Sequence, residues 1–190
     1  MLEVECRIKL SKEEFEKTRK NMAKKIEKEL EQTDIYYHPP HKYFATTSKG
    51  REFLRIRNSN QNHELTYKHA KYDKNNKLER MLEQNIIVDN GPALKEILET
   101  IGFRQYLTIT KKRSLIQIPN FEICLDEIKD LGHFIEIEYT GKIADYKKAY
   151  QKCLEQIKTL NINNPEICET GYVQMMEEKK TTNTMRKGRK

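Results

Sequence analysis

The sequence predicts an α+β protein built on an antiparallel sheet. Runs of segments with an alternation of period two, typical of strands, are interrupted by amphipathic helical segments. Short polar turns separate neighbouring strand segments, as in antiparallel hairpins. Several strands carry charged side chains on one face and aliphatic ones on the other. Helices can cover only the aliphatic face, so closure of the sheet would leave the charged faces lining a tunnel.

The chain opens with a strand and a charged helix. Residues 2–10 alternate strictly between apolar and charged side chains. Ser11 and Glu14 then form an S-x-x-E capping box, and a helical stripe of apolar residues follows from Phe15 to Leu30. Further strands are expected at residues 33–38, 52–57, 64–69 and 80–88.

The second half changes from helix to strands and back to helix. A proline near the start and a glycine at the end delimit a short helix over residues 92–102. Four strand segments follow, at residues 103–113, 114–118, 121–127 and 134–139, some of them continuous around a bend. Apolar spacing predicts a third helix over residues 143–157, and residues 166–177 are a candidate fourth helix. We interpret Tyr146, Tyr150 and Ile157 as helix core rather than as a base-stacking platform.

One strand departs from the charged-against-aliphatic pattern. Leu107 and Ile109 share their parity with Lys111 and Arg113, so strict alternation would place aliphatic and cationic side chains on one face. A β-bulge near Thr110 would reconcile the two halves of this strand.

The length and charge bound the domain organisation. The chain has 190 residues, which suits one domain, and its net charge of +7 first suggests a polyanionic partner. Residues 179–190 hold six basic residues and no acidic one, which predicts a disordered basic tail after a domain at residues 1–178. Without that tail the chain has 30 basic and 29 acidic residues, so it is nearly neutral. Any electrostatic binding by the domain must therefore come from local clusters of like charge.

The composition also excludes several protein classes. No stretch approaches the ~18 consecutive apolar residues of a membrane span, and the first residues are not a signal peptide, so we expect a cytoplasmic protein without a membrane partner. The four cysteines form no C-x-x-C pair, which argues against a zinc site and against a disulfide scaffold.

The charged strand faces suggest a ligand that carries phosphate and metal. Their carboxylates are Glu3, Glu5, Glu136 and Glu138. Their cations are Arg7, Lys9, Arg55, Arg57 and Lys68. Glutamates two apart on a strand offer hard oxygen ligands that suit Mg²⁺ or Mn²⁺, and arginine binds phosphate oxygens bidentately. Charges of both signs inside a protein therefore predict a chain of phosphates with one or two divalent ions.

These residues resemble the CYTH family, named for class IV adenylyl cyclases and thiamine triphosphatases and also called triphosphate tunnel metalloenzymes. The resemblance begins with EVECRIK and continues through TDIYYHPP, FLRIR, LTYKHA, TKKRS, FEICLDEIKDLGHFIEIE and GYVQMM. The segments DIYYHPP, LTYK and CLDEIKDLGHFIEIE are most similar to the class IV adenylyl cyclase branch.

The resemblance implies a closed antiparallel barrel of about eight strands, with helices outside and a triphosphate in its lumen. The implied metal-binding acids are Glu3, Glu5 and Glu136, with Glu138 as a neighbouring candidate. The implied phosphate-binding residues are Arg55, Arg57, Lys68, Lys111 and Arg113. Asp126 matches an acidic position beside the site, and Arg80 and Glu83 fall in an equally charged strand.

The sequence departs from the family signature at Arg7, which stands where the family has lysine. Arginine can bind phosphate but cannot act as a base, because it keeps its proton at all ordinary pH values. In hydrolytic members that lysine acts on water together with a tyrosine, which is Tyr36 here. Lys9 lies on the same strand face, ~7 Å further along, and is the candidate substitute. Arg7, Lys9, Tyr36 and Asp126 are therefore the candidate catalytic residues.

Three functions remain open. The first is cyclisation of ATP to cyclic AMP and pyrophosphate, and the second is hydrolysis of inorganic, nucleoside or thiamine triphosphate. The third is a non-enzymatic module that binds polyphosphate or the 5′-triphosphate of RNA, for which the tail would supply salt-sensitive affinity. Nucleic acid is not expected as a partner except through that tail, and the resemblance suggests a homodimer.

Overall fold

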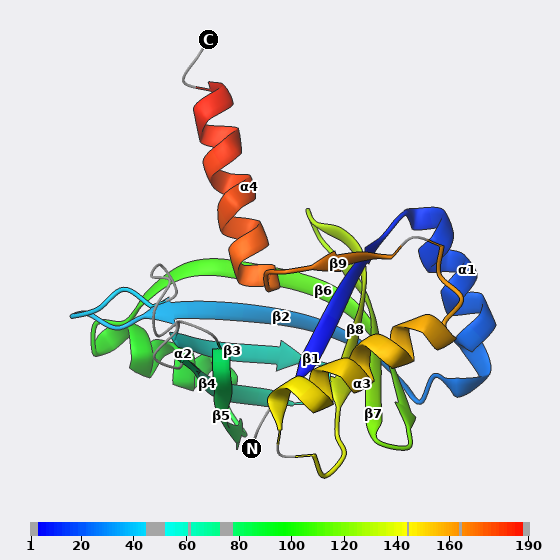
Figure 1. Ribbon diagram of the computed structural model, residues 1–190. Coiled ribbons are helices and arrows are strands. Elements are labelled where there is room, and N and C mark those ends of the chain that lie inside the picture. Colours follow the sequence, from blue (N-terminus) through cyan, green and yellow to red (C-terminus); the bar gives the residue numbers. More distant parts are fainter. Residues whose placement is uncertain are drawn as a thin grey trace.

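The computed structural model describes residues 4–44, 52–60, 62–72, 78–143, 145–163 and 165–187. The strands are β1 Glu5–Leu10, β2 Lys28–His38, β3 Glu52–Ser59, β4 His63–Tyr72, β5 Leu78–Val88, β6 Arg104–Ile118, β7 Phe121–Ile128, β8 Gly132–Tyr139 and β9 Glu166–Cys168. The α-helices are α1 Lys12–Met22, α2 Gly91–Thr100, α3 Tyr146–Thr159 and α4 Tyr172–Lys187. The predicted α+β class is confirmed (Figure 1).

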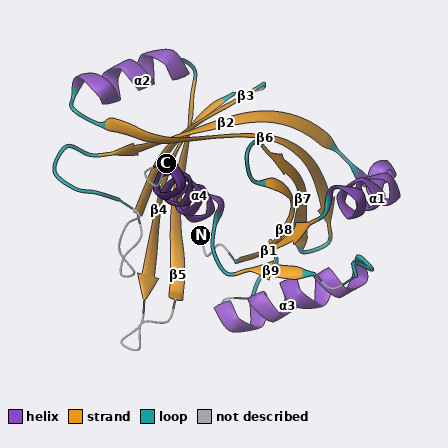
Figure 2. Cartoon of the chain, turned by 90° about the horizontal axis from the view of Figure 1, so that it is seen from above, coloured by secondary structure: helices purple, strands orange, loops and turns teal. Residues whose placement is uncertain are grey.

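The nine strands form one antiparallel sheet in the order β5-β4-β3-β2-β6-β7-β8-β1-β9. Seen from above, the sheet curls into an arc (Figure 2). The predicted closed barrel is not confirmed, because no strand pairing among the described residues joins the edge strands β5 and β9. The edge strand β9 has three residues, and residues 169–171 lead from it into α4. The sheet is therefore a curved, open structure, which we call the cup (Figure 2), and no strand pairing among the described residues closes the gap between its two edges.

Helices cover the aliphatic convex face of this sheet, as the sequence predicts. Helices α1 and α3 pack on β1 and β8, and α2 packs on β3 and β6. The main core lies under α1 and α3, where Phe15 and Cys153 meet Ile8, Ile135 and Ile137. Burial of such side chains contributes about 1.5–3 kcal/mol each. The charged faces are thereby left on the concave side.

Helix α4 packs on the concave side of the cup instead. Its first turns bring Tyr172, Val173 and Met176 against Leu107 and Ile109 of β6. The alternation of β6 is regular through this region, so the bulge predicted near Thr110 is wrong. Aliphatic and cationic side chains do share one face, because α4 covers the aliphatic part. An irregularity in the β2–β6 pairing does occur, between Tyr36 and Tyr37 of β2.

Several predicted boundaries also change. The first helix ends at Met22, and a 3-10 turn at Ala23–Lys25 leads into β2, so Leu30 belongs to a strand rather than to the helical stripe. The segments 103–113 and 114–118 are one continuous strand.

The C-terminal part differs from the expectation as well. The candidate fourth helix at residues 166–177 divides into the strand β9 and the start of α4. Helical backbone continues to Lys187, where the sequence predicted an irregular tail, while residues 188–190 lie outside the described part. The domain boundary at residue 178 stays a prediction. None of the helices in the described ranges has the length and apolar character needed to cross a membrane.

Candidate functional site

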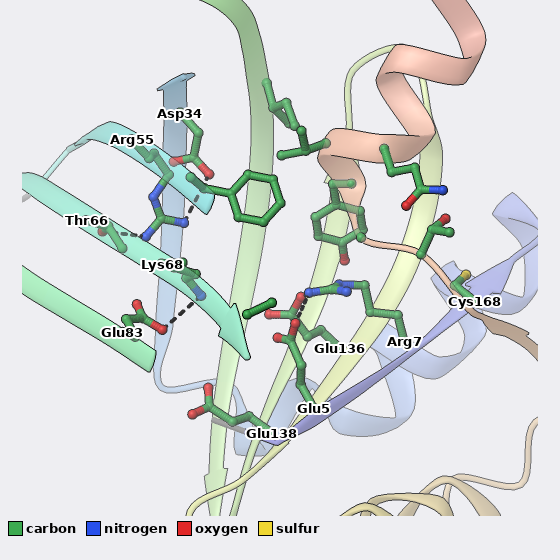
Figure 3. A pocket seen from close by; sticks show the side chains of 18 of the residues that line it. Glu5, Arg7, Asp34, Arg55, Thr66, Lys68, Glu83, Glu136, Glu138 and Cys168 are labelled. Carbon is green, nitrogen blue, oxygen red and sulfur yellow. Dashed lines mark hydrogen bonds and ion pairs between the residues drawn. The ribbon is translucent and has the colours of Figure 1, made fainter. Parts of the chain in front are cut away.

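The concave face of the sheet and the start of α4 enclose a cavity of about 1230 Å³. Alternation places charged residues of the strands β1 to β8 on this face, because successive side chains of a strand point to opposite sides. All but one of the lining cations lie on β3, β4 and β6, and four carboxylates lie on β1, β7 and β8. Figure 3 shows Arg55 and Lys68 across the cavity from Glu5 and Glu136. The cavity is therefore polarised, with a cationic wall facing an acidic one.

Asp34 of β2 organises the cationic wall. Arg57 donates to its two carboxylate oxygens at 2.7 and 2.8 Å, and the side chains of Arg55 and Lys111 lie 3.7 and 3.8 Å away. These three cations hold the pKa of the buried Asp34 carboxyl far below its usual range, despite the opposing effect of burial. Asp34 thus stays ionised and orients three groups toward the same space.

Arg55 is fixed by further contacts across the strands. Its guanidinium donates to Thr66 at 2.8 Å and to Glu64 at 3.2 Å, both on β4. Its Nε is buried and has no hydrogen-bond partner among the described residues. An unsatisfied buried donor is unfavourable, so this nitrogen is available to an anion in the cavity. Lys68 extends the cationic wall from β4 and pairs with Glu83 of β5 at 2.9 Å.

A second buried network joins β6, β7 and β8. Arg113 donates to Asp126 at 2.7 and 2.6 Å and to Glu136 at 3.0 Å. The hydroxyl of Tyr172 donates to Asp126 at 3.0 Å and so attaches α4 to the sheet. Asp126 is fully buried and does not line the cavity, so its role is to position Arg113 and Tyr172.

Arg7 bridges two carboxylates of the acidic wall. Its guanidinium bonds to Glu5 and donates to Glu136 at 2.6 Å, and it lies over the ring of Tyr172 at 4.7 Å from the centroid. Although burial alone would lower it, the two carboxylates raise the pKa of Arg7. The guanidinium therefore remains charged and cannot serve as a base. Arg7 instead holds the two predicted metal ligands beside each other.

Lys111 is a cation of the site whose pKa is lowered. Burial, together with Arg113 and Arg57, lowers its pKa to about 8, although Asp34 and Asp126 act in the other direction. Its charge near neutral pH is thus sensitive to the ligand, since a polyanion favours the protonated amine.

The charge balance of the cavity fits a cation that accompanies the phosphate. Six cationic and eight acidic side chains line the described part of the cavity, so the lining carries a formal surplus of carboxylates. Burial and the neighbouring Glu5, Glu122 and Glu136 raise the pKa of Glu138 to about 7. Uncompensated carboxylate oxygens of this kind suit a hard divalent ion. Within the described residues, however, no three acidic, histidine or cysteine side chains converge on one point, because Arg7 holds Glu5 and Glu136.

The structure gathers most of the residues that the sequence predicts. The predicted residues that line the cavity are Glu5, Arg7, Tyr36, Arg55, Arg57, Lys68, Glu83, Lys111, Arg113, Glu136 and Glu138. Lys9 does not line the cavity: its side chain is exposed near the end of β1, where the strand pairs with Glu166 of β9, so Lys9 cannot substitute for the signature lysine in this arrangement. Glu3 and the side chain of Arg80 lie outside the described residues.

Several residues of the site are not among those that the sequence predicts. Asp34 shares its parity with Tyr36 in the TDIYYHPP segment, and that signal could have found it. Glu64 and Thr66 share the parity of Lys68 in the same strand and could have been found in the same way. Tyr172 lies in the GYVQMM segment of the resemblance, but its place at the site depends on the packing of α4.

The comparison with known families agrees with this geometry. The family described as the CYTH domain matches residues 1–172. The chain belongs to the CYTH family. The match includes every cavity residue on β1 to β8 and ends at Tyr172, the first residue of α4.

Relatives of this CYTH chain cover nearly its whole length. The Methanocaldococcus jannaschii protein named "Putative adenylate cyclase MJ0240" is 29% identical and aligns over 92% of this chain and 98% of its own. The structure of the PH1819 protein from Pyrococcus horikoshii has a TM-score of 0.74, with 29% identity over 93% and 99% of the two chains. Hippeastrum HpAC1, named as an adenylyl cyclase with a dominant triphosphatase activity, has a TM-score of 0.63 and 14% identity over 93% and 95%, which concerns the fold alone. Family membership supports the prediction that the CYTH chain is an enzyme.

Proposed function

We propose that the chain is a divalent-metal-dependent enzyme that converts ATP to cyclic AMP and pyrophosphate. The observation that carries this proposal is the polarised cavity, in which Arg55, Arg57 and Lys111 face the carboxylates Glu5 and Glu136. The adenylate cyclase name of the Methanocaldococcus relative favours cyclisation among the reactions of a bound triphosphate. The predicted homodimer and cytoplasmic location stay predictions.

The residues of the cationic wall would bind and orient the triphosphate. Arginine matches phosphate oxygens in a fixed fork, and the partners of Arg55, Arg57 and Arg113 fix their orientation before the ligand arrives. In the cyclase reaction the 3′-oxygen of the ribose attacks the α-phosphorus while pyrophosphate leaves. Positioned cations lower this barrier because they stabilise the negative charge that develops on the phosphates.

Glu5 and Glu136, with Glu138 beside them, would hold Mg²⁺ or Mn²⁺. When bound, such an ion neutralises phosphate charge and acts as a Lewis acid. The bonds of Arg7 to Glu5 and Glu136 would be exchanged for bonds to the ligand, which leaves the guanidinium free to bind phosphate. This role does not require Arg7 to lose its proton.

One observation favours hydrolysis as a second candidate. Lys111 has a pKa of about 8 and shares the cavity with the buried hydroxyl of Tyr36. A lysine in this range can exchange a proton with water near neutral pH, whereas an arginine cannot. Water activated in this way would attack the terminal phosphorus, and the bond from this phosphorus to the bridging oxygen would break, which releases orthophosphate and the remaining diphosphate.

The products separate these two reactions. The enzyme is incubated in turn with ATP, tripolyphosphate and thiamine triphosphate in the presence of Mg²⁺ or Mn²⁺, and the products are resolved by chromatography. We expect cyclic AMP and pyrophosphate in equal amounts from ATP. ADP and orthophosphate from ATP, without cyclic AMP, would contradict the cyclase and support the hydrolase.

Binding of the triphosphate should weaken as the pH rises through about 8. The polyanion favours the protonated form of Lys111, and this proton is lost above its lowered pKa. We therefore expect the dissociation constant for tripolyphosphate to rise by up to about tenfold per pH unit above pH 8, as for one linked proton. Titration calorimetry from pH 7 to pH 10 measures this slope.

Two methionine variants test the origin of that slope. Lys111→Met should bind weakly at pH 7 and lose the slope. Lys112→Met is the matched control, because its side chain is 71% exposed on the other face of β6, and it should keep the slope. A slope that persists in Lys111→Met would exclude Lys111 as the titrating group.

A further inference from the structure

Two tyrosines of α3, Tyr146 and Tyr150, lie at the cavity, although the apolar spacing of the sequence predicts them in the helix core. Ala149, Cys153 and Ile157 form the buried face of this helix. Tyr146 and Tyr150 are instead half-buried and line the cavity. Tyr150 also packs against the main core, so its interpretation as helix core is confirmed, whereas Tyr146 belongs to none of the core clusters of the described residues. Although α3 packs on the convex face, both side chains reach the border of the cavity.

The two rings form an ordered aromatic pair. They are one helical turn apart, with centroids separated by 6.2 Å and planes inclined by 8°. This is the range of parallel, offset aromatic stacking. Their position is near the acidic wall, since burial, Tyr150 and the charge of Glu5 together raise the pKa of Tyr146 to about 12. The pair thus borders the carboxylates that are proposed to hold the metal.

The cavity is larger than its phosphate-binding part requires. The cations of β3, β4 and β6 lie on the wall away from α3, which packs on β1 and β8 (Figures 1 and 2). The volume of about 1230 Å³ exceeds the ~300–1000 Å³ usual for small-molecule sites. A triphosphate on the cationic wall would therefore leave room toward Tyr146 and Tyr150, which border the cavity beside the carboxylates of the acidic wall.

We propose that Tyr146 and Tyr150 form a stacking surface for the base of a nucleoside triphosphate. The inference rests on the proposed function and deepens it, because it makes a nucleotide, rather than an inorganic triphosphate, the preferred ligand. Every nucleobase has a flat π-face, so stacking on tyrosine adds affinity with little dependence on the base. The ring of each tyrosine is the group that matters, and its hydroxyl is not required.

The test compares two ligands that differ in the nucleoside. Dissociation constants for ATP and for tripolyphosphate, each with Mg²⁺, are measured for the full-length protein and its variants. In Tyr146→Leu we expect the affinity for ATP to fall about tenfold, within the range that stacking supplies, while the affinity for tripolyphosphate is unchanged. Tyr150→Leu should give the same pattern, and Tyr146→Phe should retain the affinity for ATP.

The ratio of the two constants distinguishes the inference from a structural defect. Tyr139→Leu is the matched control: this tyrosine is half-buried against the core and does not line the cavity, so the ratio should stay at the wild-type value. An equal loss for both ligands in Tyr146→Leu, or no loss for either, would overturn the stacking surface and leave the proposed function intact. A wild-type protein that binds neither ligand would contradict the proposed function itself.

Discussion

Replacement of Glu5 by glutamine should reduce metal-dependent turnover about 100-fold or more. The carboxylate faces Glu136 across Arg7, and its charge is the part of the side chain that glutamine removes. A divalent ion contributes several kcal/mol to a phosphoryl-transfer transition state, and each 1.36 kcal/mol changes the rate about tenfold. The rate of product formation from ATP, measured over a range of Mg²⁺ concentrations, gives the effect.

The control for this experiment is Glu127→Gln. Glu127 of β7 undergoes the same chemical change, but its side chain is exposed and does not line the cavity. This variant should keep wild-type turnover and metal dependence. If Glu5→Gln instead turned over at the wild-type rate with the same response to Mg²⁺, the carboxylate site would be refuted.

Replacement of Asp126 by alanine should lower the free energy of unfolding by about 3–5 kcal/mol. The change leaves the guanidinium of Arg113 without its bidentate partner in a fully buried position, and removal of one member of a buried ion pair has this cost. The hydroxyl of Tyr172 also loses its acceptor, so the attachment of α4 to the sheet weakens. Equilibrium unfolding in urea at pH 7, followed by circular dichroism, measures the difference.

Glu155→Ala supplies the comparison on the surface. Glu155 pairs with Lys152 on the exposed side of α3, where water and salt screen the two charges and make the pair weak. We expect the free energy of unfolding of this variant to stay close to the wild-type value. An equally small change for Asp126→Ala would mean that the buried network is not a principal source of stability.

Period-two alternation predicted most of the concave face. It placed Arg55 and Arg57 together, and separately Glu136 and Glu138, because a strand directs alternate side chains to one side whatever its partners are. The same rule failed at Lys9, whose parity is right but whose place along β1 lies outside the cavity. Parity tells which face of the sheet a side chain points to. It does not tell whether that part of the strand lies inside the cavity.

Contacts between distant segments could not be predicted in this way. Whether the sheet closes depends on pairing between its edge strands, and period-two alternation does not reveal β9, which has three residues. Tyr172 reaches Asp126 over a separation of 46 residues, and only the packing of α4 brings them together. The end of the first helix at Met22 could not be predicted from apolar spacing. Ile26 lies after the turn but packs on the same core cluster, so the helical spacing of apolar residues continues past the end of the helix.

Each cation of the cavity already has an acidic partner in the folded chain. Arg7 pairs with Glu5, Arg57 with Asp34 and Lys68 with Glu83. A phosphate that enters this cavity therefore meets cations that are already paired, and apart from the Nε of Arg55, which has no hydrogen-bond partner among the described residues, it competes with carboxylates for them. Binding becomes an exchange of counter-ions, and its free energy is the difference between two sets of ion pairs. A cavity of this kind can fold and remain ordered without ligand. When the product leaves, the carboxylates pair with the cations again.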